Sequence, residues 1–233
     1  YHRATLRWRD LLFVEVHTDA GIVGLGEATC HGRVDVVEAA LRWLEPYLIG
    51  TDPAGPEAHM DRMSYRLSRW NSGIIPRTAM SAIDIALWDI EGKRLGVPVW
   101  RLLGGPIRKR YRAYYSHWSA ALASPSPEAY ARWAVETVNN GWTAVKFTVP
   151  GRDLPESGRI EALCAILAAI RKAVGSKLDV GLELAESLTL RSAIRMAEAI
   201  RPYDPFFMEE PLPRENLLEF GELSARSPVP VAT

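Results

Sequence analysis

The sequence predicts an α/β fold: an α+β domain followed by part of a (β/α) barrel. Two observations carry this prediction. The first third of the chain has a hairpin pattern and then helical patterns. After residue 109, strand-like stretches recur near Tyr111, Thr143, Leu178, Phe206 and Val229, at spacings of 32, 35, 28 and 23 residues. Each gap has room for one helix, and strands that alternate with helices are typical of a parallel sheet.

The N-terminal part reads as a hairpin followed by three helices. Strand-forming residues fill Leu11–His17 and Ile22–Glu27, and Asp19-Ala20-Gly21 between them supplies turn residues. The third helix should end at Gly96-Val97-Pro98, because glycine followed by proline terminates helices. We therefore expect an α+β domain over residues 1–108 and the first part of the barrel over 109–233; the expected helices are Val36–Leu48, Ala58–Trp70 and Thr78–Leu95.

Helix boundaries are marked between the later strands. Ser126-Pro127-Glu128 combines an N-cap, a proline at the first helical position and an acid in the first turn. We expect further helices over Arg159–Val174, which Gly175 follows, and over Thr189–Ile200. The longest apolar run, Ala162–Ile170, has nine residues, against about 20 for a membrane span, so it indicates a buried helix.

Composition narrows the classes of partner. Lysine plus arginine and aspartate plus glutamate each number 28, so the formal net charge is zero and the pI is near 7.2. Because there is no cationic excess, we expect neither nucleic acid nor a membrane surface as a partner, and a small molecule fits better. The two cysteines, Cys30 and Cys164, form no metal or disulfide motif, so we expect a reducing compartment, the cytoplasm.

Three strands place an ionisable side chain where a buried strand should be apolar. Period-two alternation puts Lys146, Glu183 and Glu209 on the face of their strands opposite the helices, and all three lie toward the carboxyl ends; Glu210 points the opposite way. Barrel active sites lie at that end. Two carboxylates beside a lysine indicate a divalent metal with oxygen ligands and an anionic ligand; a structural ion-pair network is the alternative.

The run Ser81–Gly105 closely resembles the end of the capping domain in the enolase superfamily, specifically the mandelate racemase and muconate lactonizing enzyme family. Three later segments support the resemblance: Ala144–Phe147, Leu182–Arg195 and Phe207–Leu212. At the position of Glu183 many relatives have aspartate, and a group that resembles sugar-acid dehydratases has glutamate, as this sequence does. The resemblance implies a TIM-type barrel of modified (β/α)7β form, incomplete in this chain.

The resemblance also implies a metal site. Glu183 and Glu209 match the first and second ligands of one Mg²⁺ ion, and Glu210 is a candidate for a supporting position. The family's third ligand is a glutamate in a Gly-Glu pair directly after a segment like Val229–Thr233, where this sequence stops. We therefore expect the natural polypeptide to continue beyond Thr233.

Lysine 146 matches the first lysine of the family's Lys-x-Lys motif, which makes Lys146 the candidate catalytic residue that neutralises the substrate carboxylate. The second lysine, usually a base, is replaced by Thr148. Ala185 stands two residues past Glu183, where relatives have asparagine or a catalytic histidine. The resemblance thus implies that the base is a histidine from a later strand.

Two further segments resemble substrate-contacting parts of the family. Ser116 and His117 match the exit of the first barrel strand, where a serine touches the substrate carboxylate. His31 lies in a segment that aligns with a capping-domain loop. Together with Lys146 and Thr148, these are the candidate substrate-binding residues.

The resemblance implies a Mg²⁺-dependent lyase that removes the proton α to a carboxylate through a metal-stabilised enediolate and dehydrates a sugar acid. One base suffices for this reaction, whereas a racemase needs one on each face. Two alternatives stay open: a racemase or cycloisomerase of the same family, and a non-catalytic binding relative, which Thr148 and Ala185 favour. The resemblance also implies a homo-oligomer.

Overall fold

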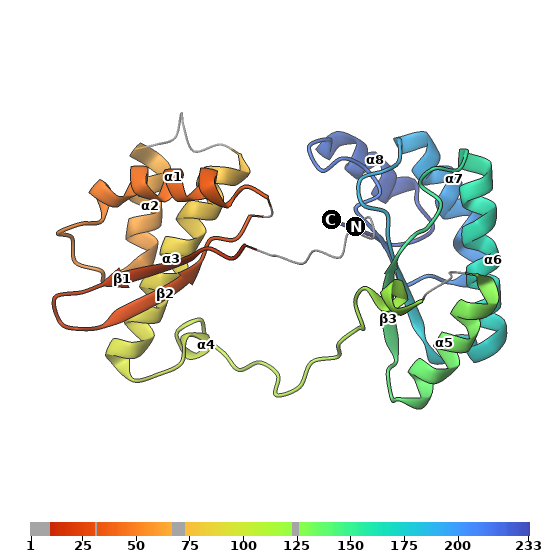
Figure 1. Cartoon of the computed structure of the whole chain (residues 1–233), viewed down its shortest axis with the longest axis horizontal. Coiled ribbons are helices and arrows are strands. Elements are labelled where there is room, and N and C mark those ends of the chain that lie inside the picture. Colours follow the sequence, from red (N-terminus) through yellow and green to blue (C-terminus); the bar gives the residue numbers. More distant parts are fainter. Residues whose placement is uncertain (1–9, 31, 67–72, 123–125) are drawn as a thin grey trace. The chain divides into compact units, whose positions relative to one another are not determined.

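A computed structural model describes residues 10–30, 32–66, 73–122 and 126–233. The chain divides into two compact units, Tyr1–Arg110 and Tyr111–Thr233 (Figure 1). We describe each unit by itself. The division lies two residues after the domain boundary expected from the sequence.

The N-terminal unit contains the expected hairpin and the expected helices. Strands β1 (Phe13–His17) and β2 (Val23–Glu27) pair antiparallel, with Phe13 opposite Glu27 and His17 opposite Val23. The helices are α1 (Val34–Leu44), α2 (Pro56–Arg66), α3 (Ile74–Leu95) and α4 (Val99–Leu102), with a 3-10 helix over Glu45–Tyr47. The last expected residues of the second helix, 67–70, lie outside the described residues.

Helix α3 packs across the hairpin, and two glycines permit the close approach. A Cβ atom on Gly24 or Gly26 would collide with the backbone carbonyl of Ala86 or Ala82. The helix ends where expected, with Gly96 in the left-handed conformation at φ 68°. It begins four residues earlier than Thr78, because Pro76 fits the first turn, where its missing N–H is not needed.

The C-terminal unit is built of parallel βα units, as the sequence predicts. Its strands are β3 (Ala144–Thr148), β4 (Asp179–Glu183), β5 (Phe207–Glu209) and β6 (Val231–Ala232), in the spatial order β3-β4-β5-β6. Helix α5 (Pro127–Asn139) precedes β3, and α6 (Glu156–Val174), α7 (Leu190–Ile200) and α8 (Leu217–Arg226) separate the four strands in sequence; the helices pack beside the sheet (Figure 1). Single 3-10 turns cover Trp118–Ala121, Gly175–Lys177 and Arg201–Tyr203.

The structure corrects the strand expected near Tyr111, and it ends the helix expected over Val36–Leu48 at Leu44. Residues 111–114 form no strand, and only Tyr115 makes an isolated parallel bridge, to Val145. Two hydrogen bonds fix this bridge: Tyr115 N–H donates to Ala144 O, and Lys146 N–H donates to Tyr115 O. The segment before the bridge is exposed and carries three arginines and one lysine, Arg108, Lys109, Arg110 and Arg112.

The C-terminal core lies between the sheet and its helices. The strand residues that alternation turns toward the helices are almost fully buried, among them Phe147, Val180, Leu182 and Met208. They pack on apolar residues of α6 and α7, and the run that predicted a buried helix supplies Leu163, Ile166, Leu167 and Ile170. Among the described residues, no helix is long and apolar enough to cross a bilayer.

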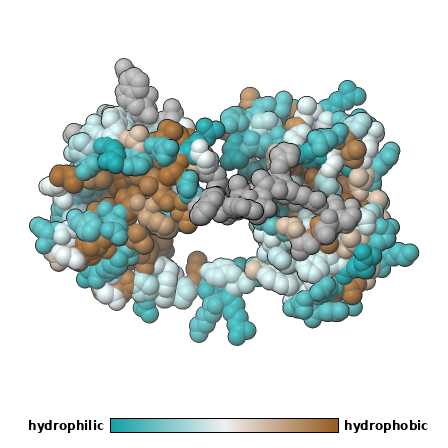
Figure 2. Space-filling view, viewed as in Figure 1, coloured by the Kyte–Doolittle hydropathy of each residue, from teal (hydrophilic) through white to brown (hydrophobic). Residues whose placement is uncertain are grey.

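Part of the surface of the N-terminal unit is hydrophobic. In Figure 2, hydrophobic residues gather on the visible face of the N-terminal unit. Large hydrophobic side chains that are exposed in that unit include Phe13, Val36, Trp43 and Ile49.

Candidate functional site

Strand register brings the three predicted ionisable residues to one end of the sheet. Glu183 on β4 lies opposite Glu209 on β5, and Thr148 on β3 lies opposite Glu183. Lys146 is two residues before Thr148 and lies opposite Gly181. The backbones therefore place the two carboxylates at one level and the lysine one level below them.

The lysine side chain reaches both carboxylates. Lys146 Nζ lies 3.5 Å from Glu183 Oε2 and contacts Glu209 Oε2 directly. The three side chains are 12%, 18% and 25% exposed in the order Lys146, Glu183, Glu209, so water screens the charges only partly. Burial disfavours the charged form of Lys146, but its bond to Glu209 and the charges of Glu209 and Glu183 outweigh this and raise the pKa of the ammonium.

Two aromatic rings border the lysine. Lys146 Nζ lies 5.7 Å from the centre of the Tyr114 ring, within the range of a cation–π contact. Tyr114 packs edge-on against Phe207, with 6.0 Å between ring centres. The Phe207 ring covers Gly181, where a Cβ atom would lie 2.7 Å from Cζ of the ring, so a side chain at this position would have to displace the ring. The sequence argument did not single out Tyr114, although alternation puts it on the same face as Ser116.

Glu183 has a second partner on its other oxygen. The Ala185 N–H donates to Glu183 Oε1 at 2.7 Å. Ala185 and the next residue, Glu186, both adopt left-handed backbone conformations, with φ of 49° and 55°. This turn is what directs the amide of Ala185 back toward the carboxylate.

The donor set fits part of a site for a hard divalent cation. Two carboxylates from neighbouring strands offer oxygen ligands of the kind that Mg²⁺ prefers, and Glu209 Oε2 is completely buried with the lysine as its ion-pair partner. Within the part of the chain that the structure describes, no group of three or more histidine, cysteine, aspartate or glutamate side chains could hold a metal. Glu183 and Glu209 could thus supply two ligands of a larger set.

The other candidate residues lie in several places. Ser116 and His117 follow the Tyr115 bridge to β3, and Ser116 Oγ is 3.1 Å from His117 Nδ1. The Glu210 carboxylate Oε1 lies 3.4 Å from Arg214 Nη2. His31 lies outside the described residues.

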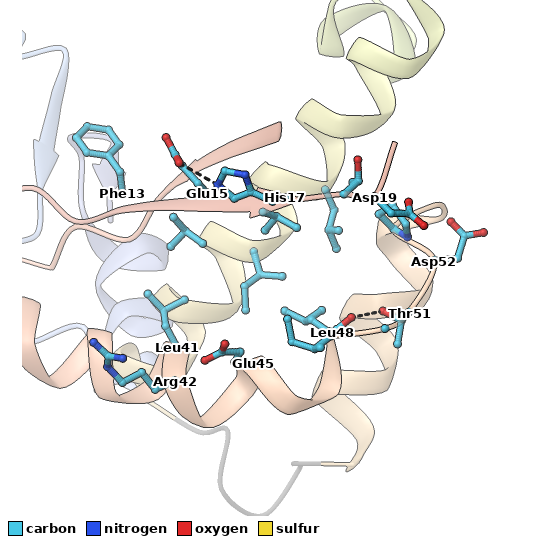
Figure 3. A pocket seen from close by; sticks show the side chains of 18 of the residues that line it. Phe13, Glu15, His17, Asp19, Leu41, Arg42, Glu45, Leu48, Thr51 and Asp52 are labelled. Carbon is cyan, nitrogen blue, oxygen red and sulfur yellow. Dashed lines mark hydrogen bonds and ion pairs between the residues drawn. The ribbon is translucent and has the colours of Figure 1, made fainter. Parts of the chain in front are cut away.

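A separate cavity of about 840 Å³ lies in the N-terminal unit, between β1, α1 and the segment after α1 (Figure 3). Its walls include the apolar Val14, Leu41 and Leu48. At its rim, His17 Nε2 lies 3.1 Å from Glu15 Oε2. None of the candidate site residues lines this cavity, so it is distinct from the carboxylate–lysine cluster.

Two family models together match most of the chain. The model described as "Mandelate racemase / muconate lactonizing enzyme, N-terminal domain" matches residues 2–104, and "Enolase C-terminal domain-like" matches residues 129–233. The chain belongs to the enolase superfamily. Within this superfamily it is a member of the mandelate racemase and muconate lactonizing enzyme family, with relatives among the sugar-acid dehydratases.

Individual enolase-superfamily proteins align over almost the whole chain. A D-galactonate dehydratase from Pectobacterium atrosepticum is 34% identical over 99% of this chain and 59% of its own length. A solved structure of an enolase-superfamily member from Salmonella Typhimurium has a TM-score of 0.87 at 29% identity, over 97% of this chain and 63% of that one. A 3,6-anhydro-D-galactonate cycloisomerase from Zobellia galactanivorans has a TM-score of 0.77 at 28% identity, over 96% of this chain and 59% of that one. The chain spans about three fifths of the length of these relatives.

Proposed function

We propose that the protein is a Mg²⁺-dependent lyase that removes the proton α to a carboxylate and dehydrates a sugar acid. The observation that carries the proposal is the cluster of Glu183, Glu209 and Lys146 at one end of the parallel sheet. The dehydratase name of a relative 34% identical over nearly the entire chain supports the reaction class. We also propose a cytoplasmic homo-oligomer.

The chain's own residues have distinct parts in this reaction. Glu183 and Glu209 would hold Mg²⁺ through their carboxylates. When bound, Mg²⁺ supplies positive charge next to the substrate carboxylate and so stabilises the negative charge that grows as the α-proton leaves. Lys146 stays protonated at neutral pH, since its pKa is raised, and its ammonium binds a carboxylate oxygen. Ser116 and His117, at the turn after the Tyr115 bridge, are the remaining substrate contacts that we propose.

The base must come from other residues. Thr148 has a neutral hydroxyl group and Ala185 a methyl group, and neither accepts a proton at neutral pH. We propose that a histidine on a later strand removes the α-proton and that the β-hydroxyl leaves as water with acid assistance. A base on one face only is compatible with dehydration.

The test is a screen of hexonates, pentonates and hexarates with the purified protein, with and without Mg²⁺, followed by mass spectrometry. We expect Mg²⁺-dependent loss of one water from at least one acid. Lys146→Met and Glu209→Gln should each lower kcat/KM by at least about a hundredfold. Glu222→Gln, an exposed glutamate of α8 paired with Arg226, is the matched control and should keep full activity. Mg²⁺ binding without any turnover, in a polypeptide that includes the proposed later strand with its histidine, would refute the lyase proposal and support a binding protein.

Cycloisomerisation is the second candidate, favoured by the structural similarity to the Zobellia galactanivorans cycloisomerase. The two reactions differ in mass balance, because a cycloisomerase product has the mass of its substrate. The same screen in D₂O distinguishes them. Deuterium incorporation with no loss of water would replace the lyase proposal by a cycloisomerase or racemase.

A further inference from the structure

The turn that follows Glu183 has a conformation that its residues do not favour. Ala185 and Glu186 are both left-handed, and a Cβ atom makes this region unfavourable for residues other than glycine. Two such residues in succession persist only when their surroundings hold them. The contacts around the turn therefore decide where the Ala185 N–H points.

The side of the turn facing β5 is held by main-chain bonds. Glu186 N–H donates to Glu210 O at 2.7 Å, and Leu188 N–H donates to Pro211 O at 3.0 Å. These bonds continue the pairing of β4 with β5 beyond the ends of both strands. They leave the opposite side of the turn, toward β3 and α6, to be held by other groups.

Two arginines hold that opposite side. Arg152, in the segment between β3 and α6, donates from Nη2 to Ala185 O. Arg159, in the first turns of α6, donates from Nη1 to Ser187 Oγ at 2.9 Å, and Ser187 Oγ in turn donates to Leu184 O. Arg152 thus binds the Ala185 carbonyl directly, and Arg159 is linked to the Leu184 carbonyl through the Ser187 hydroxyl group.

The burial of Arg159 has no explanation in ion pairing. Arg159 is only 5% exposed. Its Nε and Nη2 atoms are buried and have no hydrogen-bond partner among the described residues. Burial, together with the nearby charge of Arg152, lowers the pKa of Arg159. An apolar side chain of similar length would avoid this cost, because burying a charge without a counter-ion is unfavourable. Within the described part of the chain, the hydrogen bond to Ser187 is the one interaction of Arg159 that needs an arginine.

We propose that Arg152 and Arg159 are positioning residues that lock the left-handed turn, so that the Ala185 N–H holds the Glu183 carboxylate in its metal-binding orientation. The inference rests on the proposed function, in that Glu183 is taken as a metal ligand. Outer contacts of this kind commonly change metal affinity by about ten- to a hundredfold. The arginines would act only through the turn and would touch neither metal nor substrate.

The test measures hydrogen exchange at the Ala185 amide by NMR on the uniformly ¹⁵N-labelled chain. The variants are Arg152→Met and Arg159→Met, and the matched control is Arg132→Met on the exposed side of α5. We expect exchange at Ala185 to be about tenfold faster in both variants, as for the loss of one ordinary hydrogen bond, and unchanged in the control. Exchange of core amides in β3 and β4 should stay slow.

A second readout separates positioning from a purely structural role. For Arg159→Met, we expect a urea unfolding midpoint equal to or above that of the wild type, together with faster exchange at Ala185. The inference is overturned if Ala185 exchanges at the wild-type rate in both variants, or if its exchange rises only in step with a general loss of stability.

Magnesium titration keeps this inference separable from the proposed function. In calorimetry with Mg²⁺ alone, both variants should bind at least about tenfold more weakly than the wild type. If the wild-type chain binds no Mg²⁺, the metal site of the proposed function fails, while the exchange rates still decide whether the arginines position the Glu183 carboxylate.

Discussion

Replacing Lys146 by methionine should destabilise the C-terminal unit by about 3 kcal/mol. Methionine keeps most of the aliphatic length, so packing changes little and the loss is mainly electrostatic. Removing one partner of a buried ion pair costs about 3–5 kcal/mol. The carboxylates of Glu183 and Glu209 are 18% and 25% exposed, and partial hydration puts the expected cost at the lower end of that range.

The assay is urea unfolding at pH 7, followed by circular dichroism and by exchange of the core amides in β3 and β4, which assigns the change to the C-terminal unit. With an m-value of about 2 kcal/mol per M, the midpoint should fall by about 1.5 M. Lys172→Met, which removes an exposed lysine of α6, should shift the free energy of unfolding by no more than about 0.5 kcal/mol.

Adding Mg²⁺ sharpens the prediction. In the Lys146→Met variant the carboxylates no longer share their charge with an ammonium, so Mg²⁺ should raise the midpoint more than in the wild type. The double variant with Glu209→Gln should recover much of the lost stability, because only one carboxylate remains. A Lys146→Met protein as stable as the wild type, with no greater response to Mg²⁺, would refute the argument that this lysine neutralises the two carboxylates.

Three other predictions concern the scaffold. Gly26→Ala should destabilise the N-terminal unit by about 3 kcal/mol in urea unfolding, because the new methyl group meets the rigid Ala82 carbonyl of α3. Burial opposes the ionisation of Asp89, but Lys93 and a backbone N–H of β2 outweigh it and lower the pKa of this carboxyl group. The stability that Asp89 contributes is therefore present above pH 3.8 and is lost as the pH falls through the folded-state pKa; Asp89→Asn should remove this dependence in pH titrations of unfolding. Arg171→Met should cost about 3 kcal/mol in urea unfolding, because the guanidinium donates to four backbone carbonyls around the start of β4 and the approach to β5.

Each of these predictions has a control or a contradicting result. Gly221→Ala in α8 meets no atom within 4 Å and should stabilise by about 0.5–1 kcal/mol, so similar effects at both glycines would contradict the steric argument. An unchanged acid dependence in Asp89→Asn would show that other carboxyl groups govern it. Wild-type stability of Arg171→Met would show that water replaces the four bonds without cost.

Local signals predicted most of the fold because they act over a few residues. The Ser126 side chain caps α5 by accepting from the Ala129 N–H at 3.2 Å, and Gly96 ends α3, as their positions in the sequence indicate. Period-two alternation likewise placed Lys146 and Glu183 on the face opposite the apolar core, since the register of a half-buried strand leaves no other choice.

The rest depends on contacts between distant residues. The strand expected near Tyr111 is reduced to a bridge at Tyr115, because a strand exists only where a neighbour pairs with it. Nothing in the residue types of Ala185 and Glu186 indicates a left-handed turn; Arg152, 33 residues earlier, and the segment after β5 hold it. The contacts that hold the turn after Glu183 could therefore not be predicted from the sequence, whereas the clustering of Lys146, Glu183 and Glu209 could.

The spatial order β3-β4-β5-β6 has a consequence for how the chain folds. Each strand pairs with the one before it in sequence, so every parallel pair closes a loop of similar, moderate length and none waits for a later segment. The chain can thus assemble from β3 onward, with Lys146 and Glu183 side by side before β5 arrives. Because β3 and β4 alone bring Lys146 beside Glu183, the charge of Glu183 is balanced by a neighbour whose position does not depend on β5.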